Sequence, residues 1–171
     1  MQARTYHHQK EADIQAPQAE VFACLDDQTR LAARMKKRSM MMLGGRISCA
    51  FDAGQGRAVG SVIRMGGHFL GLSLVVVEVV TERTPPAHKT WETRGRQRLL
   101  TIVSYVMGFE TRDVAGRTST RVYIDYRLRL SLPGRWLGLL FAGFYARWCV
   151  SRMLDGASGH FRPVAEPQAT T

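Results

Sequence analysis

The chain has 171 residues, of which 45% are hydrophobic and 22% charged, a balance that excludes general disorder and is enough for one domain with a sizeable core. The net charge of +10 is compatible with an acidic partner, an anionic membrane or ligand, or an inert basic surface. The start of the chain carries no secretory h-region, and no stretch reaches the ~20 uninterrupted apolar residues of a membrane-spanning helix. We therefore expect a cytoplasmic protein.

The N-terminal part is predicted to form a strand followed by two short helices. The strand covers residues 4–15, and Pro17 follows as the first residue of a helix, where its missing N–H would be unpaired anyway. Residues 19–27 carry apolar side chains at helical spacing, and a second helix is predicted over 29–37. Two successive short helices would form a V-shaped pair.

From residue 46 to residue 132 the apolar period changes to that of β-strands. Six strands are expected, over residues 47–51, 59–65, 69–82, 88–94, 99–110 and 119–130. Gly66 and Gly67 are predicted to form a hairpin turn, and residues 113–117 a hairpin loop. The last strand alternates most cleanly between apolar and polar side chains, which is typical of an antiparallel sheet with one wet face.

A long helix is predicted from residue 133 to about Leu154, with Gly156 as its end. Apolar residues at i, i+4, i+7 and i+11 form a stripe that is expected to grip the sheet: Leu137, Phe141, Phe144 and Trp148. Residues 1–161 are expected to form a single domain, and 162–171 a mobile tail with two prolines.

The predicted fold class is α+β, in the order strand, two helices, six strands and one helix. A sheet of about seven strands is too long to pack flat against so little helix, so it must bend around the last helix. A strongly curved antiparallel sheet around a single helix leaves space between the two, and concave, mostly apolar spaces of this kind bind ligands.

This order of elements resembles the helix-grip (SRPBCC) superfamily. The resemblance is carried by residues 16–22 after the opening strand, by residues 76–86 (VVEVVTERTPP) before a strand with Trp91, and by a last strand that feeds a C-terminal amphipathic helix. The superfamily includes START-like lipid-transfer domains, the birch pollen allergen, plant hormone receptors and bacterial polyketide cyclase/dehydratase-like proteins. The resemblance extends from about residue 4 to residue 161, and it implies a cavity for a hydrophobic or amphipathic small molecule.

The cavity is expected to bind a hydrophobic or lipid-like ligand, and the protein could also transfer it. Side chains in phase with the apolar faces are the candidate ligand-binding residues: Trp91, Thr93, Tyr105, Met107, Tyr126, Phe141, Phe144 and Trp148. A pocket of ~300 Å³ or more would suit a small ligand. The alternative is that these aromatic residues simply fill a core.

An enzyme is the first alternative: a cofactor-free cyclase or dehydratase acting on a polyketide-like substrate. Tyr105 or an interior arginine would then polarise a carbonyl, although Arg64 is interior only if Ile63 and Met65 point outward. The sequence shows no acid–base pair, so the expectation leans away from catalysis. It shows no metal-ligand spacing of histidines, no CxxC pair among its three cysteines and no nucleotide-binding loop, so no metal or cofactor is expected.

A peripheral membrane protein is the second alternative. The densest basic stretch, together with a run of methionines behind it, could form a pocket mouth that docks on an anionic membrane: Arg30, Arg34, Lys36, Lys37 and Arg38, followed by Met40, Met41 and Met42. The first half of the long helix could also contact lipid. No nucleic-acid-binding module accompanies the charge, so nucleic acid is not an expected partner.

Overall fold

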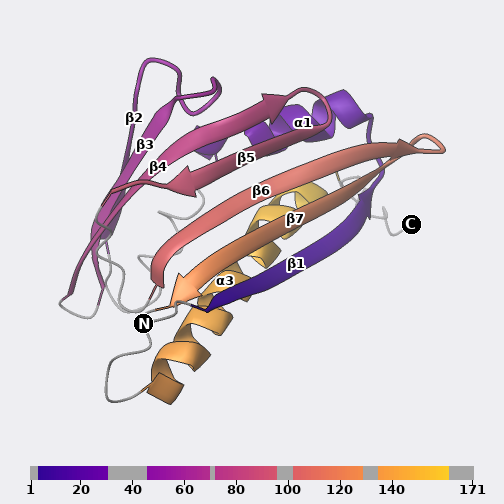
Figure 1. Ribbon diagram of the computed structural model, residues 1–171. Helices are drawn as coiled ribbons and strands as arrows, with labels where there is room; N and C mark the ends of the chain where they lie inside the picture. The colour runs from indigo at the N-terminus through magenta and orange to yellow at the C-terminus, as the bar shows by residue number, and fades with distance from the viewer. Residues whose placement is uncertain (1–3, 31–45, 70–71, 96–101, 129–134, 162–171) are drawn as a thin grey trace, which may run out of the picture.

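The computed structural model describes residues 4–30, 46–69, 72–95, 102–128 and 135–161 (Figure 1). Its elements, in chain order, are β1 (Thr5–Ile14), α1 (Gln18–Asp26), β2 (Arg46–Phe51), β3 (Val62–Phe69), β4 (Leu72–Thr84), β5 (His88–Thr93), β6 (Ile102–Val114), β7 (Arg117–Leu128) and α3 (Arg135–His160). A further helical segment begins at residues 28–30, directly after α1. The rest of the predicted second helix, the basic residues at 34–38 and Met40–Met42 lie outside the described residues.

The seven strands form one antiparallel sheet in the order β1-β7-β6-β5-β4-β3-β2. Register shifts interrupt β4 between Val80 and Glu82 and β6 between Ile102 and Ser104. Bulges of this kind bend and twist a strand, and the long strands curve around α3 in Figure 1. The predicted curved antiparallel sheet around a C-terminal helix is therefore confirmed.

The strands β6 and β7 form a long hairpin and are joined by a two-residue turn. Ala115 and Gly116 both have positive φ, at 51° and 79°, the conformation of the tight hairpin turns that match the twist of the strands. In β6, Gly108 lies beneath the Tyr123 ring of β7. A Cβ added at Gly108 would stand 2.6 Å from the Tyr123 hydroxyl, so glycine is required by this close approach.

The inner face of the sheet and one side of α3 share one hydrophobic core. The predicted inward residues of the last strand, Val122, Ile124, Tyr126 and Leu128, all lie in it. From α3, however, the core receives mostly small side chains: Ala142, Ala146, Val150, Met153, Leu154 and Ala157. Of the stripe predicted for this helix, Phe144 is therefore wrongly placed and Trp148 lies beside the core, whereas the side chains of Leu137 and Phe141 are outside the described residues. Small residues let α3 approach β1 and β7 closely, whereas Phe144 is 64% exposed.

Tertiary packing changes two predicted boundaries and the side of the sheet that one strand residue faces. Gly66 and Gly67 do not turn: they lie inside β3 and pair with both β2 and β4. The helix α3 does not end before Gly156 but continues to His160, because buried Ala157 holds this part against the core. Val103 lies two residues before Tyr105, where strict strand alternation would give it the same inward face, but it is exposed because the bulge at residues 102–104 shifts the alternation.

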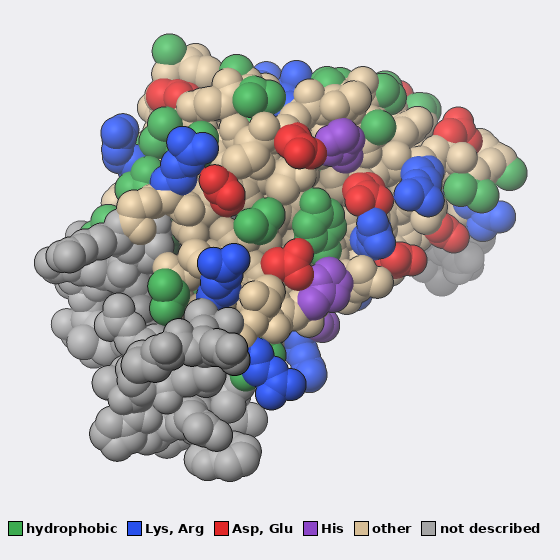
Figure 2. All heavy atoms as spheres, in the orientation of Figure 1, with side chains coloured by type: hydrophobic (Ala, Val, Ile, Leu, Met, Phe, Trp, Pro, Cys, Tyr) green, Lys and Arg blue, Asp and Glu red, His purple; other side chains and the backbone are tan. Residues whose placement is uncertain are grey.

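Charged side chains of both signs are interspersed over the face of the molecule seen in Figure 2. Several are paired across strands, such as His7 with Asp125 at 2.7 Å and Arg121 with Glu110 at 2.7 Å. Arg64 is also exposed, since its neighbour Ile63 is buried, and it therefore takes no part in the interior. None of the helices in the described part of the chain has the length and apolar character needed to cross a bilayer.

Candidate functional site

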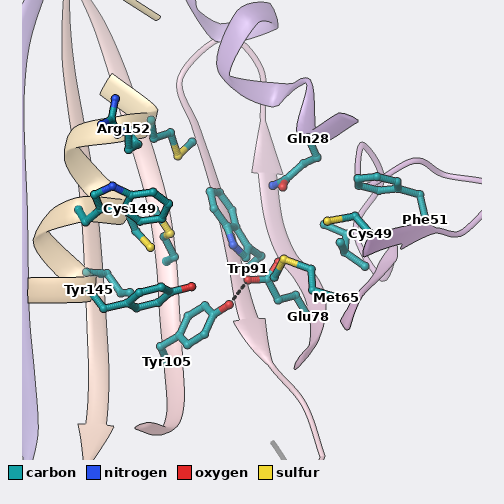
Figure 3. A pocket seen from close by; sticks show the side chains of 15 residues that line it. Gln28, Cys49, Phe51, Met65, Glu78, Trp91, Tyr105, Tyr145, Cys149 and Arg152 are labelled. Atoms are coloured by element: carbon teal, nitrogen blue, oxygen red, sulfur yellow. Dashed lines mark hydrogen bonds between the residues drawn. The ribbon is translucent and has the colours of Figure 1, made fainter. Parts of the chain in front are cut away.

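A cavity lies between α3 and the inner face of strands β2 to β7 (Figure 3). Its walls are mainly apolar and aromatic, with a few polar groups among them: Gln28, Cys49, Phe51, Ile63, Met65, Glu78, Trp91, Tyr105, Met107, Ile124, Tyr145, Trp148, Cys149, Arg152 and Met153. The centres of water-sized molecules can occupy about 60 Å³ of it, enough for several waters.

This volume is smaller than the expected ~300 Å³. Met65, Met107 and Met153 account for part of the difference, since their flexible side chains extend into the wall from β3, β6 and α3. Methionine has three rotatable bonds and adapts its shape to its neighbours. A molecule larger than a few waters would fit only if such side chains moved.

A buried carboxyl group, that of Glu78, is the central polar feature of the cavity. Glu78 lies on β4 between Val76 and Val80, which face the same interior, and it is only 4% exposed. The Tyr105 hydroxyl on β6 donates a hydrogen bond to its Oε1 atom, drawn as a dashed line in Figure 3. The Trp91 side chain on β5 also donates to this carboxyl group.

Burial sets the protonation of this group. It raises the pKa of the Glu78 carboxyl to about 7, against the lowering effects of the Tyr105 and Trp91 hydrogen bonds and of nearby Lys89. Burial also raises the pKa of Tyr105 well above its usual range, so the phenol remains a donor. A carboxyl group with a pKa near 7 can hold or release a proton at neutral pH, as a general acid or base does.

Gln28 supplies a second polar group, an amide whose Nε2 atom has no hydrogen-bond partner among the described residues. Asp27 caps the helical segment that Gln28 begins, since its Oδ1 atom accepts a hydrogen bond from the Arg30 amide at 3.1 Å. This places the Gln28 side chain in the cavity wall, 5% exposed, with its amide directed toward Trp91 in Figure 3. Within the described part of the chain, the Gln28 Nε2 atom finds no hydrogen-bond acceptor.

A separate ion cluster, built around the buried Asp26 and Lys89, does not line the cavity. Asp26, at the end of α1, binds the Lys89 ammonium at 2.7 Å and the Arg83 guanidinium at 2.8 Å. Lys89 is 0% exposed and also donates to the Asp26 carbonyl oxygen at 3.3 Å. Burial raises the pKa of Asp26, but the hydrogen bonds from Arg83 and Lys89 outweigh this and hold that pKa below its ordinary value.

The thiols of Cys49 and Cys149 line the cavity from β2 and α3. Burial raises the pKa of Cys149 to about 12, so this thiol is neutral at physiological pH and is not an activated nucleophile. Within the described ranges, no three His, Cys, Asp or Glu side chains gather in a way that could hold a metal ion.

The structure brings half of the sequence-predicted ligand residues together. Trp91, Tyr105, Met107 and Trp148 line the cavity. Thr93 lies outside the lining and bonds the backbone of Tyr105 instead, accepting from its amide at 3.0 Å. This hydrogen bond anchors Tyr105 across the two strands.

The remaining predicted residues are placed elsewhere. Tyr126 is buried in the core, where its ring stacks on Tyr6 with centroids 5.6 Å apart. Phe144 is exposed and does not line the cavity. The Phe141 side chain lies outside the described residues.

Sequence reasoning missed Glu78 and Gln28. The signal for Glu78 was present, because a single acidic residue between Val76 and Val80 shares their inward face by strand alternation. No comparable signal marks Gln28, whose position depends on the junction between two helical segments.

The sequence model of a family described as "Polyketide cyclase / dehydrase and lipid transport" matches residues 6–166. A search of curated proteins finds no significant match. Three similar solved structures are TTHA0849 from Thermus thermophilus, the Zhui aromatase/cyclase from Streptomyces sp. R1128, and norcoclaurine synthase from Thalictrum flavum with dopamine and hydroxybenzaldehyde.

The TM-scores for these three structures are 0.67, 0.62 and 0.62, at 16%, 11% and 13% sequence identity, respectively. The alignments cover 91%, 92% and 92% of this chain, and 97%, 93% and 87% of the three others. At such identities the likeness shows the fold alone.

Proposed function

This chain belongs to the polyketide cyclase / dehydrase and lipid transport family, of SRPBCC type, and from this premise we propose that it binds a hydrophobic or lipid-like small molecule in the cavity beneath α3. The observation that carries the proposal is the cavity itself, with its aromatic and methionine walls and its few polar groups. Apolar walls supply the affinity for such a ligand, and a small number of polar groups orient it. The same binding would serve a carrier that transfers the ligand.

Native mass spectrometry of the freshly purified protein tests this proposal directly. A bound hydrophobic molecule should appear as a mass that is lost on denaturation. Titration with an environment-sensitive apolar fluorophore gives the second measurement, and it needs no knowledge of the natural ligand. A folded protein that carries no small molecule and does not bind the fluorophore would refute the proposal.

A matched pair of variants locates the binding. Cys149→Phe adds bulk to the cavity wall, and we expect fluorophore affinity to fall roughly tenfold, with a stability cost of about 1–3 kcal/mol from overpacking. Val114→Phe makes a comparable enlargement at a position that is 54% exposed, at the β6–β7 turn, and should leave affinity unchanged. Equal effects of the two substitutions would place the fluorophore elsewhere.

A second candidate function, cyclisation with loss of water, is favoured by the Glu78–Tyr105 pair. In such a reaction Glu78 would remove a proton from carbon, and Tyr105 would donate a hydrogen bond to the carbonyl oxygen of the group that the resulting carbanion attacks. A new carbon–carbon bond forms, and the resulting alkoxide takes up the proton that Glu78 removed. Glu78 would then remove a second α-proton and pass it to the hydroxyl, which leaves as water. Incubation with a linear poly-β-keto thioester, followed by mass spectrometry, would reveal a product lighter by one water.

Glu78→Gln separates the two functions. If the protein is an enzyme, the product should disappear in this variant while fluorophore binding remains, because glutamine keeps the shape of the side chain but cannot take up a proton. A rate that survives the substitution would rule out Glu78 as the base.

Binding to an anionic membrane surface is a third candidate, favoured by the exposure of Phe144 with Arg147, also exposed, on the next turn of α3. Sedimentation with vesicles tests it. Binding should require anionic lipid, weaken with salt, and fall in Phe144→Ser and on charge reversal of Lys36, Lys37 and Arg38. Equal sedimentation with neutral vesicles would contradict this role.

A further inference from the structure

The two polar groups that the cavity leaves incompletely paired need opposite kinds of partner. The Gln28 Nε2 atom is a donor without an acceptor among the described residues. The Glu78 carboxyl already accepts bonds from Tyr105 and Trp91, yet a carboxylate has about four acceptor sites, so it can accept more. A buried polar atom without a partner costs about 1–3 kcal/mol, and a ligand that supplies the partner recovers this energy.

The charged and titratable groups around Glu78 come from every wall. Tyr105 projects from β6 and Lys89 from β5, while Tyr145 and Cys149 face it from α3. Lys89 is already bound to Asp26, so its charge is largely neutralised. No cation among the described residues therefore binds Glu78 directly.

Arg152, a further lining residue on α3, does not change this balance. Its guanidinium lies over the Trp148 ring, 6.0 Å from the centroid, and its side chain is exposed. A solvated charge at the rim is screened by water and salt, whereas the Glu78 charge is not.

We infer that the cavity selects a neutral hydrophobic ligand that carries a hydroxyl group, and that it rejects ligands whose polar group is a carboxylate. The inference rests on the proposed binding function and specifies the ligand class of the same cavity. A hydroxyl can donate to a Glu78 oxygen and can accept from Gln28 Nε2, so it suits both groups. A carboxylate can accept from Gln28 but has no proton to donate, and its charge repels that of ionised Glu78.

The test uses four compounds that share one apolar body: 2-methylnaphthalene, 2-naphthalenemethanol, 2-naphthoate and 2-naphthylmethylammonium. Their dissociation constants are measured by calorimetry at about pH 8.5, where Glu78 is ionised. We expect the alcohol to bind most tightly and the carboxylate at least roughly tenfold more weakly than the alcohol. Tighter binding of the ammonium than of the alcohol, or equal binding of the carboxylate, would overturn the inference.

Two variants assign the selectivity to its residues. Glu78→Gln should strengthen naphthoate binding roughly tenfold relative to methylnaphthalene binding, and circular dichroism shows whether the variant is folded. Gln28→Leu should weaken binding of the alcohol but not of methylnaphthalene. An unchanged naphthoate affinity in Glu78→Gln overturns the inference, whereas failure of methylnaphthalene to bind the native protein overturns the binding function itself.

Discussion

Two buried carboxyl groups, Asp26 and Glu78, differ in what surrounds them. Asp26 is held by two cations, the fully buried Lys89 and the partly exposed Arg83. Glu78 is held by two neutral donors and faces a cavity. Burial raises the pKa of both, but only Asp26 has enough positive charge beside it to bring its pKa below the ordinary value. Matched charge stabilises the buried Asp26, and the carboxyl group without a matching cation is the one that we propose contacts the ligand.

Lys89→Met should have the largest effect on stability, because it leaves Asp26 buried with only Arg83 as its cationic partner. We expect the free energy of unfolding in urea to fall by about 3–5 kcal/mol. Lys10→Met is the matched control: the Lys10–Asp155 pair at 2.9 Å is solvent-exposed, so its loss should cost less than about 1 kcal/mol. A similarly small loss in Lys89→Met would mean that the cluster does not stabilise the fold.

Glu78→Gln should change the pH dependence of stability. The pKa of Glu78 is 4.5 in its ordinary state and about 7 in the folded protein. Between these two pH values the folded protein keeps the Glu78 proton, whereas the unfolded chain has released it. The free energy of unfolding therefore falls as pH rises through this window. The total change is about 3 kcal/mol, since each pKa unit corresponds to about 1.4 kcal/mol. The variant should lose this dependence and become more stable than the native protein above pH 7.

The measurement is urea unfolding at several pH values. Glu82→Gln on the same strand serves as the control, because the Glu82 side chain is 67% exposed and its removal should leave the slope in place. An identical slope in native protein and Glu78→Gln would show that the Glu78 carboxyl is not what responds to pH. Asp26 acts with the opposite sign: its lowered pKa gives stability that is lost as pH falls.

Gln28→Leu should have the smallest effect on stability, in contrast to Gln18→Leu. Gln28 Nε2 makes no hydrogen bond to the described residues, so its removal should leave stability unchanged or raise it by about 1 kcal/mol. Gln18 donates to the carbonyl oxygens of Pro86 and Thr111 at 3.1 and 2.8 Å, so its loss should cost about 1–2 kcal/mol. Equal losses of melting temperature in the two variants would show that Gln28 has a structural partner after all.

The sheet could be predicted from the sequence because strand alternation is a local property. It placed Trp91, Tyr105 and Met107 on the inner face, and all three line the cavity. The order of elements likewise led to the curved sheet and the gripping helix. Alternation fails at a bulge, however, which is why Val103, two residues before Tyr105, does not share its inward face.

The helix face and the polar groups of the cavity depend on tertiary packing that no local pattern records. In α3 the large aromatic residues dominated the predicted stripe, but a close approach to β1 and β7 requires Ala142 and Ala146 on that side, and Phe144 is left exposed. Gln28 reaches the cavity only because Asp27 begins a new helical segment there.

The pairing of β1 with β7 has a consequence for how the chain folds. His7 and Asp125, hydrogen-bonded in the native sheet, are 118 positions apart in sequence. Contacts so distant along the chain slow folding, because a long loop must close before the contacts stabilise anything. On the ribosome, β1 emerges before the other six strands of the sheet and must wait until all of them have been made, because its neighbour β7 is the last. The cavity, with walls from both β2 and α3, is therefore complete only once α3 has been synthesised.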